Sequence, residues 1–452
     1  MESTSVLPST NYAVTMQLIR SRTVRIGIVG LGYVGLPLAL MFSSNGVVVE
    51  GFDIDPAKVE KLLSRRSYIW RIAPEEISAA RDRGFHATTD LAHIADVDII
   101  ILCVPTPLNE NQEPDLRFIR ETAFAIAPHL RAGQLIVLES TTYPGTTEEV
   151  VLPILEEANC AHLKVSRNTA AKDDVFLAFS PEREDPGNTA VERRDVPRVV
   201  GGVDRFSTEL AAELYAIAFR QIVPVSTPAV AEMTKLLENI YRCVNIALVN
   251  ELKQLCMRMG VDIWEVIDAA KTKPFGFHPF YPGPGLGGHC IPIDPFYLSW
   301  KARAFDFRTK FIELAGEVNT EMPYFVVRCL SEALNQQKKS INGSRILVLG
   351  IAYKKDIDDL RESPSLTIIE LLRRAKAQVD YNDPFLPHVG HGRHYDLNMI
   401  SASIDDVSCY DGVLIATDHS SYDYPRIVSQ AKLVIDTRNA TRGIESEKIV
   451  RC

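Results

Sequence analysis

The stretch that decides the fold is residues 24–55, which read VRIGIVGLGYVGLPLALMFSSNGVVVEGFDID. Two apolar runs, over 24–29 and 47–52, predict short buried strands, and the segment between them predicts an apolar helix. The turn that opens the helix holds three glycines, Gly30, Gly32 and Gly35. Strand, glycine turn, helix and strand in this order predict a βαβ unit of a doubly wound sheet.

Each glycine of this turn has a distinct task in binding a dinucleotide. Gly30 permits the tight turn, Gly32 lets the backbone approach a pyrophosphate, and Gly35 lets the helix lie close to the strand. The helix N-terminus then faces the phosphates. Asp53 lies eighteen residues after the last glycine, where it would bind the ribose hydroxyls and repel a 2′-phosphate. We therefore expect an NAD site here, rather than a turn without a ligand.

Polar residues follow the next strands of the expected sheet. Further apolar runs predict strands over 98–104, 134–138 and 176–179. Thr106 follows the first run, Thr141 the second and Glu182 the third. Ligands of doubly wound sheets bind at the carboxyl ends of the strands. Although each residue alone could simply cap a loop, their shared position predicts a functional rim.

Length and composition exclude several classes of protein. At 452 residues the chain predicts two or three domains. Its net charge of −9 argues against a nucleic-acid or anionic-membrane partner. The eight cysteines have neither disulfide-framework nor zinc-finger spacing, so we expect no metal site and a reduced, cytoplasmic setting. Residues 1–22 are polar and patternless, which predicts a loose leader.

A long helix is expected over 228–260. Apolar residues recur there at helical spacing: Met233, Leu236, Leu237, Ile240, Val244, Ala247, Leu248, Leu252 and Leu255. At 1.5 Å per residue this helix reaches about 50 Å, which suits a connection between domains and a dimer interface. Lys235, Asn239 and Arg242 share a polar face. Such a face is ordinarily solvated, and it matters to function only if it faces the segment described next.

Residues 281–294, YPGPGLGGHCIPID, combine four glycines, three prolines and one cysteine. This composition excludes a helix interior or a central strand and predicts a shaped loop. The loop would present Cys290 as a nucleophile, with Asp294 nearby; the alternative is an ordinary buried cysteine. Helices are expected near 295–304 and over 311–339, with Pro323 dividing the second stretch into two.

A second set of αβ units begins at the strand expected over 344–350. The turn that follows, GIAYKKDIDDLRESPS, has one glycine, so it is not a second dinucleotide fingerprint. It brings Lys354, Lys355 and Arg361 close to a helix start at Pro364, an arrangement that suits a phosphate. Further strands are expected over 378–381, 412–416 and 433–436, the last followed by Arg438.

These residues together resemble the UDP-glucose/GDP-mannose dehydrogenase family. The matching segments are GLGYVGLP at 30–37, STTYPGTT at 140–147, SPERE at 180–184, EMTKLLEN at 232–239, PGLGGHCIPIDP at 284–295 and GIAYKKDIDDLRES at 350–363. The resemblance implies an α/β fold of two Rossmann-like doubly wound domains joined by a long central helix. The expected parts are a leader (1–22), an NAD-binding domain (23–225), a central helical and dimerisation region (226–325) and a UDP-sugar-binding domain (326–452).

The resemblance also implies a reaction, the four-electron oxidation of the C6 hydroxymethyl of a nucleotide sugar by two NAD. Cys290 would be the nucleophile, with Lys235, Asn239 and Asp294 as catalytic neighbours. Thr141 would hold a water and Glu182 would assist thioester hydrolysis. Cofactor contacts are implied for Gly30, Gly32, Tyr33, Val34, Gly35, Asp53, Lys58, Thr106 and Thr141. Substrate contacts are implied for Glu182, Arg183, Lys235, Asn239, Gly287, Lys354, Lys355, Arg361 and Arg438.

The nucleophile loop reads GLGGHC, with His289, and resembles the branch that acts on UDP-N-acetylhexosamines. UDP-N-acetylglucosamine is the expected substrate, with UDP-N-acetylgalactosamine, UDP-N-acetylmannosamine and UDP-glucose as alternatives. The product would serve surface polysaccharide synthesis, and the enzyme would be a homodimer or larger homo-oligomer. Outside the family, a two-electron hydroxyacid-type dehydrogenase would share the glycine turn and the lysine–asparagine helix, but it would not need Cys290.

Overall fold

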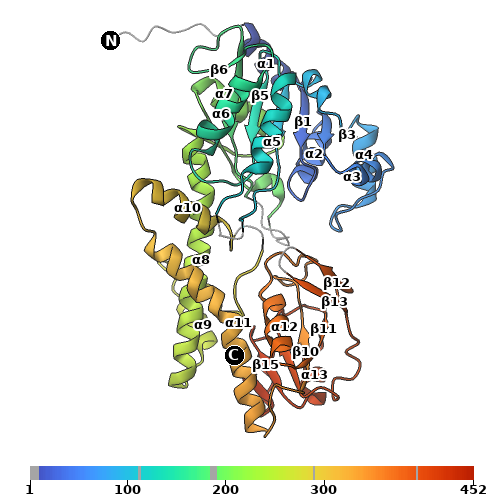
Figure 1. Ribbon diagram of the computed structural model, residues 1–452, viewed down its shortest axis with the longest axis vertical. Helices are drawn as coiled ribbons and strands as arrows, with labels where there is room; N and C mark the ends of the chain where they lie inside the picture. Colours follow the sequence, from blue (N-terminus) through green and yellow to red (C-terminus); the bar gives the residue numbers. More distant parts are fainter. Residues whose placement is uncertain (1–9, 110–112, 184–190, 289–290, 393–394) are drawn as a thin grey trace. The chain divides into compact units, whose positions relative to one another are not determined.

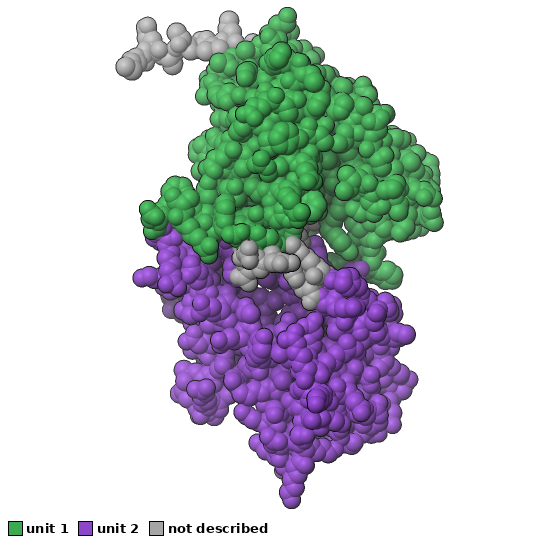
Figure 2. All heavy atoms as spheres, viewed as in Figure 1, with its two compact units in different colours: residues 1–238, 300–306 green, residues 239–299, 307–452 purple. Residues whose placement is uncertain are grey.

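The computed structural model describes residues 10–109, 113–183, 191–288, 291–392 and 395–452. The chain forms two compact units, coloured separately in Figure 2. We call Met1–Glu238 with Trp300–Asp306 unit 1, and Asn239–Ser299 with Phe307–Cys452 unit 2. Each unit has its own sheet and its own core.

Within its described residues, unit 1 is built on a nine-stranded sheet in the order β3-β2-β1-β4-β5-β7-β8-β9, with β6 paired to β7. Its strands are β1 (Arg25–Val29), β2 (Val48–Phe52), β3 (His86–Thr88), β4 (Ile99–Leu102), β5 (Leu135–Leu138), β6 (Lys164–Val165), β7 (Asp174–Phe179), β8 (Arg198–Gly202) and β9 (Ile222–Val225). All pairs are parallel except β7 with β8. The strand order reverses direction between β1 and β4, which places the ligand-binding switch point at their carboxyl ends.

Helices cover both faces of this sheet, as Figure 1 shows. Alternate residues of β4 divide between the faces: Ile99 and Ile101 pack with α1, α2 and α7, whereas Ile100 and Leu102 pack with α5 and α6. The helices of unit 1 before the long connection are α1 (Thr10–Ser21), α2 (Gly35–Ser44), α3 (Pro56–Leu63), α4 (Pro74–Asp82), α5 (Arg117–Ile126), α6 (Leu152–Ala158) and α7 (Arg205–Ala216). Shorter turns are η1 (Leu91–Asp96), η2 (Ala127–His129), η3 (Thr147–Val151), η4 (Arg193–Asp195) and η5 (Arg303–Phe305). The expected doubly wound first domain is confirmed.

The expectation of a loose leader is wrong for residues 10–21, because they form α1. Met16 and Ile19 of this helix are buried in the core of unit 1. The Thr15 hydroxyl also donates to the carbonyl of Gly133 over 2.8 Å. The apolar residues of α1 are too few for their periodicity to predict a helix. The helix is stabilised instead by packing on the sheet.

Unit 2 contains a parallel sheet in the order β11-β10-β14-β15-β16 and a separate antiparallel pair, β12 with β13. Its strands are β10 (Arg345–Leu349), β11 (Gln378–Asn382), β12 (His388–His391), β13 (Asp396–Ile400), β14 (Gly412–Ile415), β15 (Val434–Asp436) and β16 (Ile449–Arg451). Helices α11 (Lys310–Gln336) and α12 (Pro364–Arg374) cover one face, and α13 (Tyr424–Gln430) covers the other. The expected second doubly wound domain is therefore also confirmed, with its switch point between β10 and β14.

Helix α8 (Pro228–Met259) is the long helix that the sequence predicts, and it continues from unit 1 into unit 2. In unit 2 it packs on α11 through Cys243, Ala247 and Ala315. The remaining helices of unit 2 are α9 (Ile263–Ala270) and α10 (Asp294–Ala302), which ends beyond the unit boundary. Among the described residues, none of the helices combines the length and apolar character that crossing a bilayer requires.

The expectation that Pro323 divides the 311–339 stretch is wrong. Helix α11 continues through this proline from Lys310 to Gln336. Proline in a helix removes one N–H donor, which leaves the carbonyl four residues earlier without its usual partner. The buried neighbours Met322, Phe325 and Val326 anchor the helix on both sides of the proline. Packing thus outweighs the lost hydrogen bond.

Candidate active site

The glycine turn after β1 has the shape that a dinucleotide requires. Gly30 has a φ of +93°. A Cβ at Gly35 would lie 1.9 Å from the Gly30 carbonyl oxygen, so only glycine allows this close approach. A Cβ at Gly32 would meet no atom within 4 Å. The turn is closely packed where the helix meets the strand and open where a pyrophosphate would lie, so these residues fit NAD.

Asp53 ends β2 beside this turn. Its Oδ2 accepts the N–H of Leu31 over 3.0 Å and the ammonium of Lys58 over 3.0 Å. The Lys58 side chain remains 34% exposed. Tyr33 is exposed and Thr106 is buried. Asp53 and Lys58, both predicted to contact the cofactor, are thus brought together at the switch point, and Val34 begins the adjoining helix as its N-cap.

A buried ion-pair network follows at the ends of β5, β7 and β8. The Arg198 guanidinium pairs with Glu139 and, over 3.3 Å, with Glu182, and its Nε donates to Ser180 over 2.9 Å. Tyr215 donates its hydroxyl proton to Glu139. The side chains of Arg198 and Glu139 are almost fully buried. Burial opposes the charge, yet the two carboxylates raise the pKa of Arg198 well above its ordinary value.

The sequence predicts a role for Glu182 but offers no motif that includes its partner Arg198. The strand register explains why the two residues meet. Ala178 pairs with Gly202 and Phe179 with Gly201 in the antiparallel ladder. Extending that register by three residues places position 198 opposite position 182, but β8 ends in two glycines and its pairing cannot be read from periodicity alone.

A second missed residue, Glu232 of α8, holds the loop that carries Thr141. Its Oε2 accepts the N–H of Gly145 over 2.6 Å. Its Oε1 accepts the N–H and the hydroxyl of Thr147 over 3.0 and 2.7 Å. Burial raises the pKa of Glu232 to about 7 despite these donors. Thr141 itself is half-buried, and the adjacent Thr142 is buried.

Two of the three residues on the predicted polar face of α8 are buried and one is solvated. Lys235 is 6% and Asn239 is 5% exposed, whereas Arg242 is exposed. The Arg183 guanidinium pairs with Glu238, with Nε and Oε2 3.2 Å apart, and donates to the Pro197 carbonyl over 2.6 Å. Arg183 and Lys235 are therefore both placed by this part of the helix.

In unit 2, two predicted catalytic residues meet. The Asn239 amide donates to Oδ2 of Asp294, and both side chains are buried. The glycine loop is tied to the same helix, because the N–H of Gly283 donates to Asn250 Oδ1 over 2.9 Å. Asn250 in turn donates to Asn319 Oδ1 of α11 over 2.9 Å. His289 and Cys290 lie outside the described residues.

The glycine loop packs on the turn that follows β10. The N–H of Gly288 donates to the Arg361 carbonyl over 2.9 Å, and a Cβ at Gly287 would lie 2.5 Å from the Cβ of Tyr353. A Cβ at Gly283 would likewise lie 2.5 Å from Arg438 Nη1. Two of the residues predicted to bind substrate, Arg361 and Arg438, thus lie against the described part of the glycine loop.

The cations of this turn have acidic neighbours. Arg361 forms a bidentate pair with Asp359, with Nη2 and Oδ2 2.7 Å apart. Lys355 lies 3.7 Å from Asp418. Burial lowers the pKa of Arg438, whose Nε donates to the Ala416 carbonyl. Lys354 follows β10 in the same turn. Four predicted substrate-binding cations therefore follow β10 and β15 at the carboxyl edge of the second sheet.

Comparison with known proteins gives consistent results along the chain. Three models of the UDP-glucose/GDP-mannose dehydrogenase family match: the NAD binding domain over residues 24–219, the central domain over 229–321 and the UDP binding domain over 347–443. A UDP-N-acetyl-D-glucosamine 6-dehydrogenase of Pseudomonas aeruginosa is 33% identical over 89% of this chain and 92% of its own length. An NDP-N-acetyl-D-galactosaminuronic acid dehydrogenase of Ralstonia nicotianae is 34% identical over 91% and 95%.

Among solved structures, that of a UDP-D-ManNAc dehydrogenase from Pyrococcus horikoshii superposes with a TM-score of 0.81 at 32% identity. The match covers 94% of this chain and 97% of that one.

Replacing Arg198 tests the buried network. Arg198→Met leaves Glu139 buried without its counter-charge, which costs about 3–5 kcal/mol, so we expect a lower thermal midpoint. Arg198→Met combined with Glu139→Gln should recover much of that loss, because the fully buried charge of Glu139 is then removed and only Glu182, which is 16% exposed, keeps a charge without Arg198. Arg220→Met is the control, since Arg220 pairs with Asp195 while 59% exposed. Equal midpoints for the Arg198 single and double variants would contradict this account.

Glu232 predicts a pH dependence of stability. Its folded pKa of about 7 lies above the ordinary value of 4.5, so the folded state keeps the proton that the unfolded chain loses. The stabilisation is complete below pH ~4.5 and is lost as the pH rises to ~7. The thermal midpoint of the wild type should therefore fall relative to that of Glu232→Gln over this interval, because Gln does not titrate. Glu251→Gln, at an exposed position of α8, should show no such trend; a constant difference for Glu232→Gln would refute the assignment.

Proposed function

Because the chain belongs to the UDP-glucose/GDP-mannose dehydrogenase family, we propose that it oxidises C6 of UDP-N-acetylglucosamine to the carboxylate. One observation carries the proposal: Asn239 and Asp294, 55 positions apart, meet in a buried hydrogen bond beside the glycine loop. A two-electron hydroxyacid-type dehydrogenase would not need a cysteine in that loop. The loop therefore favours the four-electron reaction over the two-electron one.

NAD supplies the hydride acceptor, so that one sugar, two NAD+ and one water give one uronate, two NADH and three protons. In unit 1, the glycine turn and Asp53 hold this cofactor. Lys235, with a water held by Asp294, takes the proton of the C6 hydroxyl and stabilises the oxyanion. Asn239 orients the Asp294 carboxylate through the hydrogen bond that the structure contains.

The second half of the reaction depends on Cys290. Its thiolate forms a C–S bond to the aldehyde carbon, giving a thiohemiacetal whose C–H hydrogen can leave as hydride. Lys235 favours the thiolate by its charge. Water, held by Thr141, then attacks the resulting thioester with Glu182 assisting. The C–S bond breaks, the thiol regains its proton, and the uronic acid leaves.

The substrate is assigned within a group of close alternatives. The relatives' names include glucosamine, galactosaminuronic acid and mannosamine derivatives at about equal identity. We assign UDP-N-acetylglucosamine from the GLGGHC form of the nucleophile loop. We further propose that residues 23–225 form the NAD-binding domain, 226–325 the central region and 326–452 the UDP-sugar domain, with Gly287, Lys354, Lys355, Arg361 and Arg438 as substrate contacts.

A homodimer is proposed from the exposed face of α8. The helix packs on α11 and α9 within unit 2, but Leu248, Leu252, Leu255 and Met259 are 38–65% exposed. Their spacing of three to four residues places them on one stripe of the helix. A contiguous apolar stripe of this length is a common protein–protein interface. A second copy of the chain, packing on the same face about a two-fold axis, would cover it.

The stoichiometry of the reaction tests the proposed function. With limiting UDP-N-acetylglucosamine, we expect two NADH per sugar, and UDP-glucose nearly inert. Cys290→Ala should abolish uronate formation, because no thiohemiacetal can form. Cys409→Ala, at an exposed position, should behave as wild type. One NADH per sugar, or normal uronate formation by Cys290→Ala, would rule out the thioester route.

The dimer proposal is tested by placing charged side chains on the exposed apolar stripe of α8. Leu248→Lys with Leu255→Lys places two cations in the expected apolar contact, so we expect the molar mass from light scattering to fall to that of one chain. Ile400→Lys, at a 77% exposed position of β13, is the control and should leave the mass unchanged. An unchanged mass for the charged stripe would exclude this face as the interface.

A further inference from the structure

The two units begin their sheets with the same backbone construction. In unit 1, Gly30 has a φ of +93° and donates its N–H to the Phe52 carbonyl over 2.7 Å. In unit 2, Gly350 has a φ of +78° and donates to the Asn382 carbonyl over 2.8 Å. Each bond joins the glycine after the first strand to the last residue of the second strand. The turns after β1 and β10 therefore occupy equivalent positions.

An aspartate occupies the same place in both constructions. Asp53 follows β2, and its Oδ2 accepts the N–H of Leu31 over 3.0 Å. Asp383 follows β11, and its Oδ2 accepts the N–H groups of Ile351 and Ala352 over 2.8 and 3.1 Å. Asp383 is thus the positional counterpart of the acid that unit 1 offers to a ribose.

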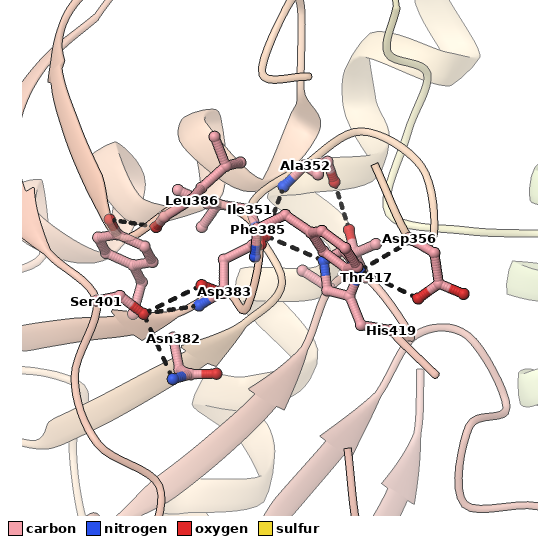
Figure 3. Close-up of polar contacts among 12 residues, drawn as sticks. Ile351, Ala352, Asp356, Asn382, Asp383, Phe385, Leu386, Ser401, Thr417 and His419 are labelled. Atoms are coloured by element: carbon pink, nitrogen blue, oxygen red, sulfur yellow. Dashed lines mark hydrogen bonds and ion pairs between the residues drawn. The ribbon is translucent and has the colours of Figure 1, made fainter. Parts of the chain in front are cut away.

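The difference between the units is His419, which follows β14 and is completely buried. Its Nδ1 accepts the N–H of Asp356 over 3.0 Å. Since a backbone N–H can only donate, Nδ1 carries the lone pair, and Nε2–H donates to Asp383 Oδ2 over 3.0 Å. Figure 3 shows the imidazole between the two aspartates. Burial acts against ionisation, but the hydrogen bond from His419 helps to hold the pKa of Asp383 below its ordinary value.

The same segment holds the turn at further points. The Thr417 hydroxyl donates to the Ala352 carbonyl over 2.6 Å. The N–H and hydroxyl of Ser420 donate to the two oxygens of Asp356 over 2.8 and 2.6 Å. The turn 351–356, which includes Lys354 and Lys355, is therefore held at Ala352 and Asp356 by four hydrogen bonds with Thr417, His419 and Ser420.

The corresponding position of unit 1 is built differently. There, the side chain that reaches Asp53 is Lys58, a flexible and partly exposed lysine. In unit 2, the acid faces a rigid ring that is fully buried. The Oδ1 atoms of the two acids are used alike: that of Asp383 accepts the N–H of Phe385 over 2.9 Å, and that of Asp53 accepts the N–H of Asp55 over 3.0 Å. The difference between the units therefore lies at Oδ2, where Asp383 has a buried ring in place of a partly exposed lysine.

We propose that His419 is a positioning residue for nucleotide-sugar binding, holding residues 351–356 so that their lysines meet the diphosphate. The inference rests on the proposed function, which assigns this turn to the substrate. In this arrangement Asp383, the counterpart of the acid that unit 1 offers to a ribose, instead supports the turn that we assign to the diphosphate. A buried hydrogen-bonded ring suits that task, because it fixes the backbone without taking part in the chemistry.

The test compares binding of UDP, measured by titration calorimetry, with steady-state kinetics. His419→Phe keeps the ring and removes both nitrogen contacts. Loss of a charge-assisted hydrogen bond should raise the UDP Kd and the nucleotide-sugar KM about tenfold or more. We expect kcat within about threefold of wild type, because no reacting group is removed. The KM for NAD should not change, and His419→Gln, which retains a donor for Asp383, should restore part of the affinity.

His391→Phe is the matched control, because His391 is an exposed histidine near an aspartate in the same unit. If His419→Phe does not fold, Ser420→Ala tests the same turn, because the Ser420 hydroxyl bonds Asp356. We expect this variant to raise the UDP Kd about threefold. A role in folding alone would lower the active fraction and kcat while leaving both KM values intact, which would overturn the proposal. Unchanged UDP affinity in folded His419→Phe would also overturn it. Failure of the wild type to bind UDP would instead contradict the proposed function, and the positioning role with it.

Discussion

The hydrogen bonds and ion pair made by the polar side chains of α8 are the contacts on which the candidate site of each unit depends. Within 32 residues it supplies Glu232 to the Thr141 loop, Glu238 to Arg183, Asn239 to Asp294 and Asn250 to Gly283. An α-helix fixes the spacing of its residues at 1.5 Å and 100° per position. Within each unit, two separate chain segments therefore take their positions from the part of α8 that belongs to that unit. A helix that only joined two domains would not need buried polar side chains along its length.

Two buried acidic groups of unit 1, Glu232 of α8 and Glu139 after β5, are likewise held by hydrogen-bond donors. Removing an ion from water is expensive unless the protein returns the lost hydrogen bonds. Glu232 receives three donors. Glu139 receives Arg198 and Tyr215. Each carboxylate is thus held by groups from other elements, so its position is set as firmly as that of the strands around it. Burying these two acidic side chains costs stability, but it fixes their orientation.

The two doubly wound sheets share one backbone arrangement, although the family models assign NAD to the first and UDP to the second. Both place a glycine with positive φ at the end of the first strand and an acid at the end of the second. In unit 1 the glycine-rich turn leaves space beside the helix start, as NAD requires. In unit 2 His419 and Asp383 hold a turn that carries cations. The ligand class follows from the side chains added to the plan and not from the plan itself.

The sequence by itself determined the strands of both sheet centres, the glycine turn with Asp53, helix α8 and the family, because apolar periodicity and glycine spacing are local signals. It failed where local signals are weak or are overruled. Helix α1 forms by packing, Pro323 stays inside α11, and the short strands β3, β6, β8, β9, β12, β13 and β16 carry no clear alternation. Only the tertiary structure revealed that Arg198 pairs with Glu182, Glu232 with the Thr141 loop and His419 with Asp383. These partners lie 16 to 87 positions apart, and their contacts arise only when the sheets bring their strand ends and covering helices together.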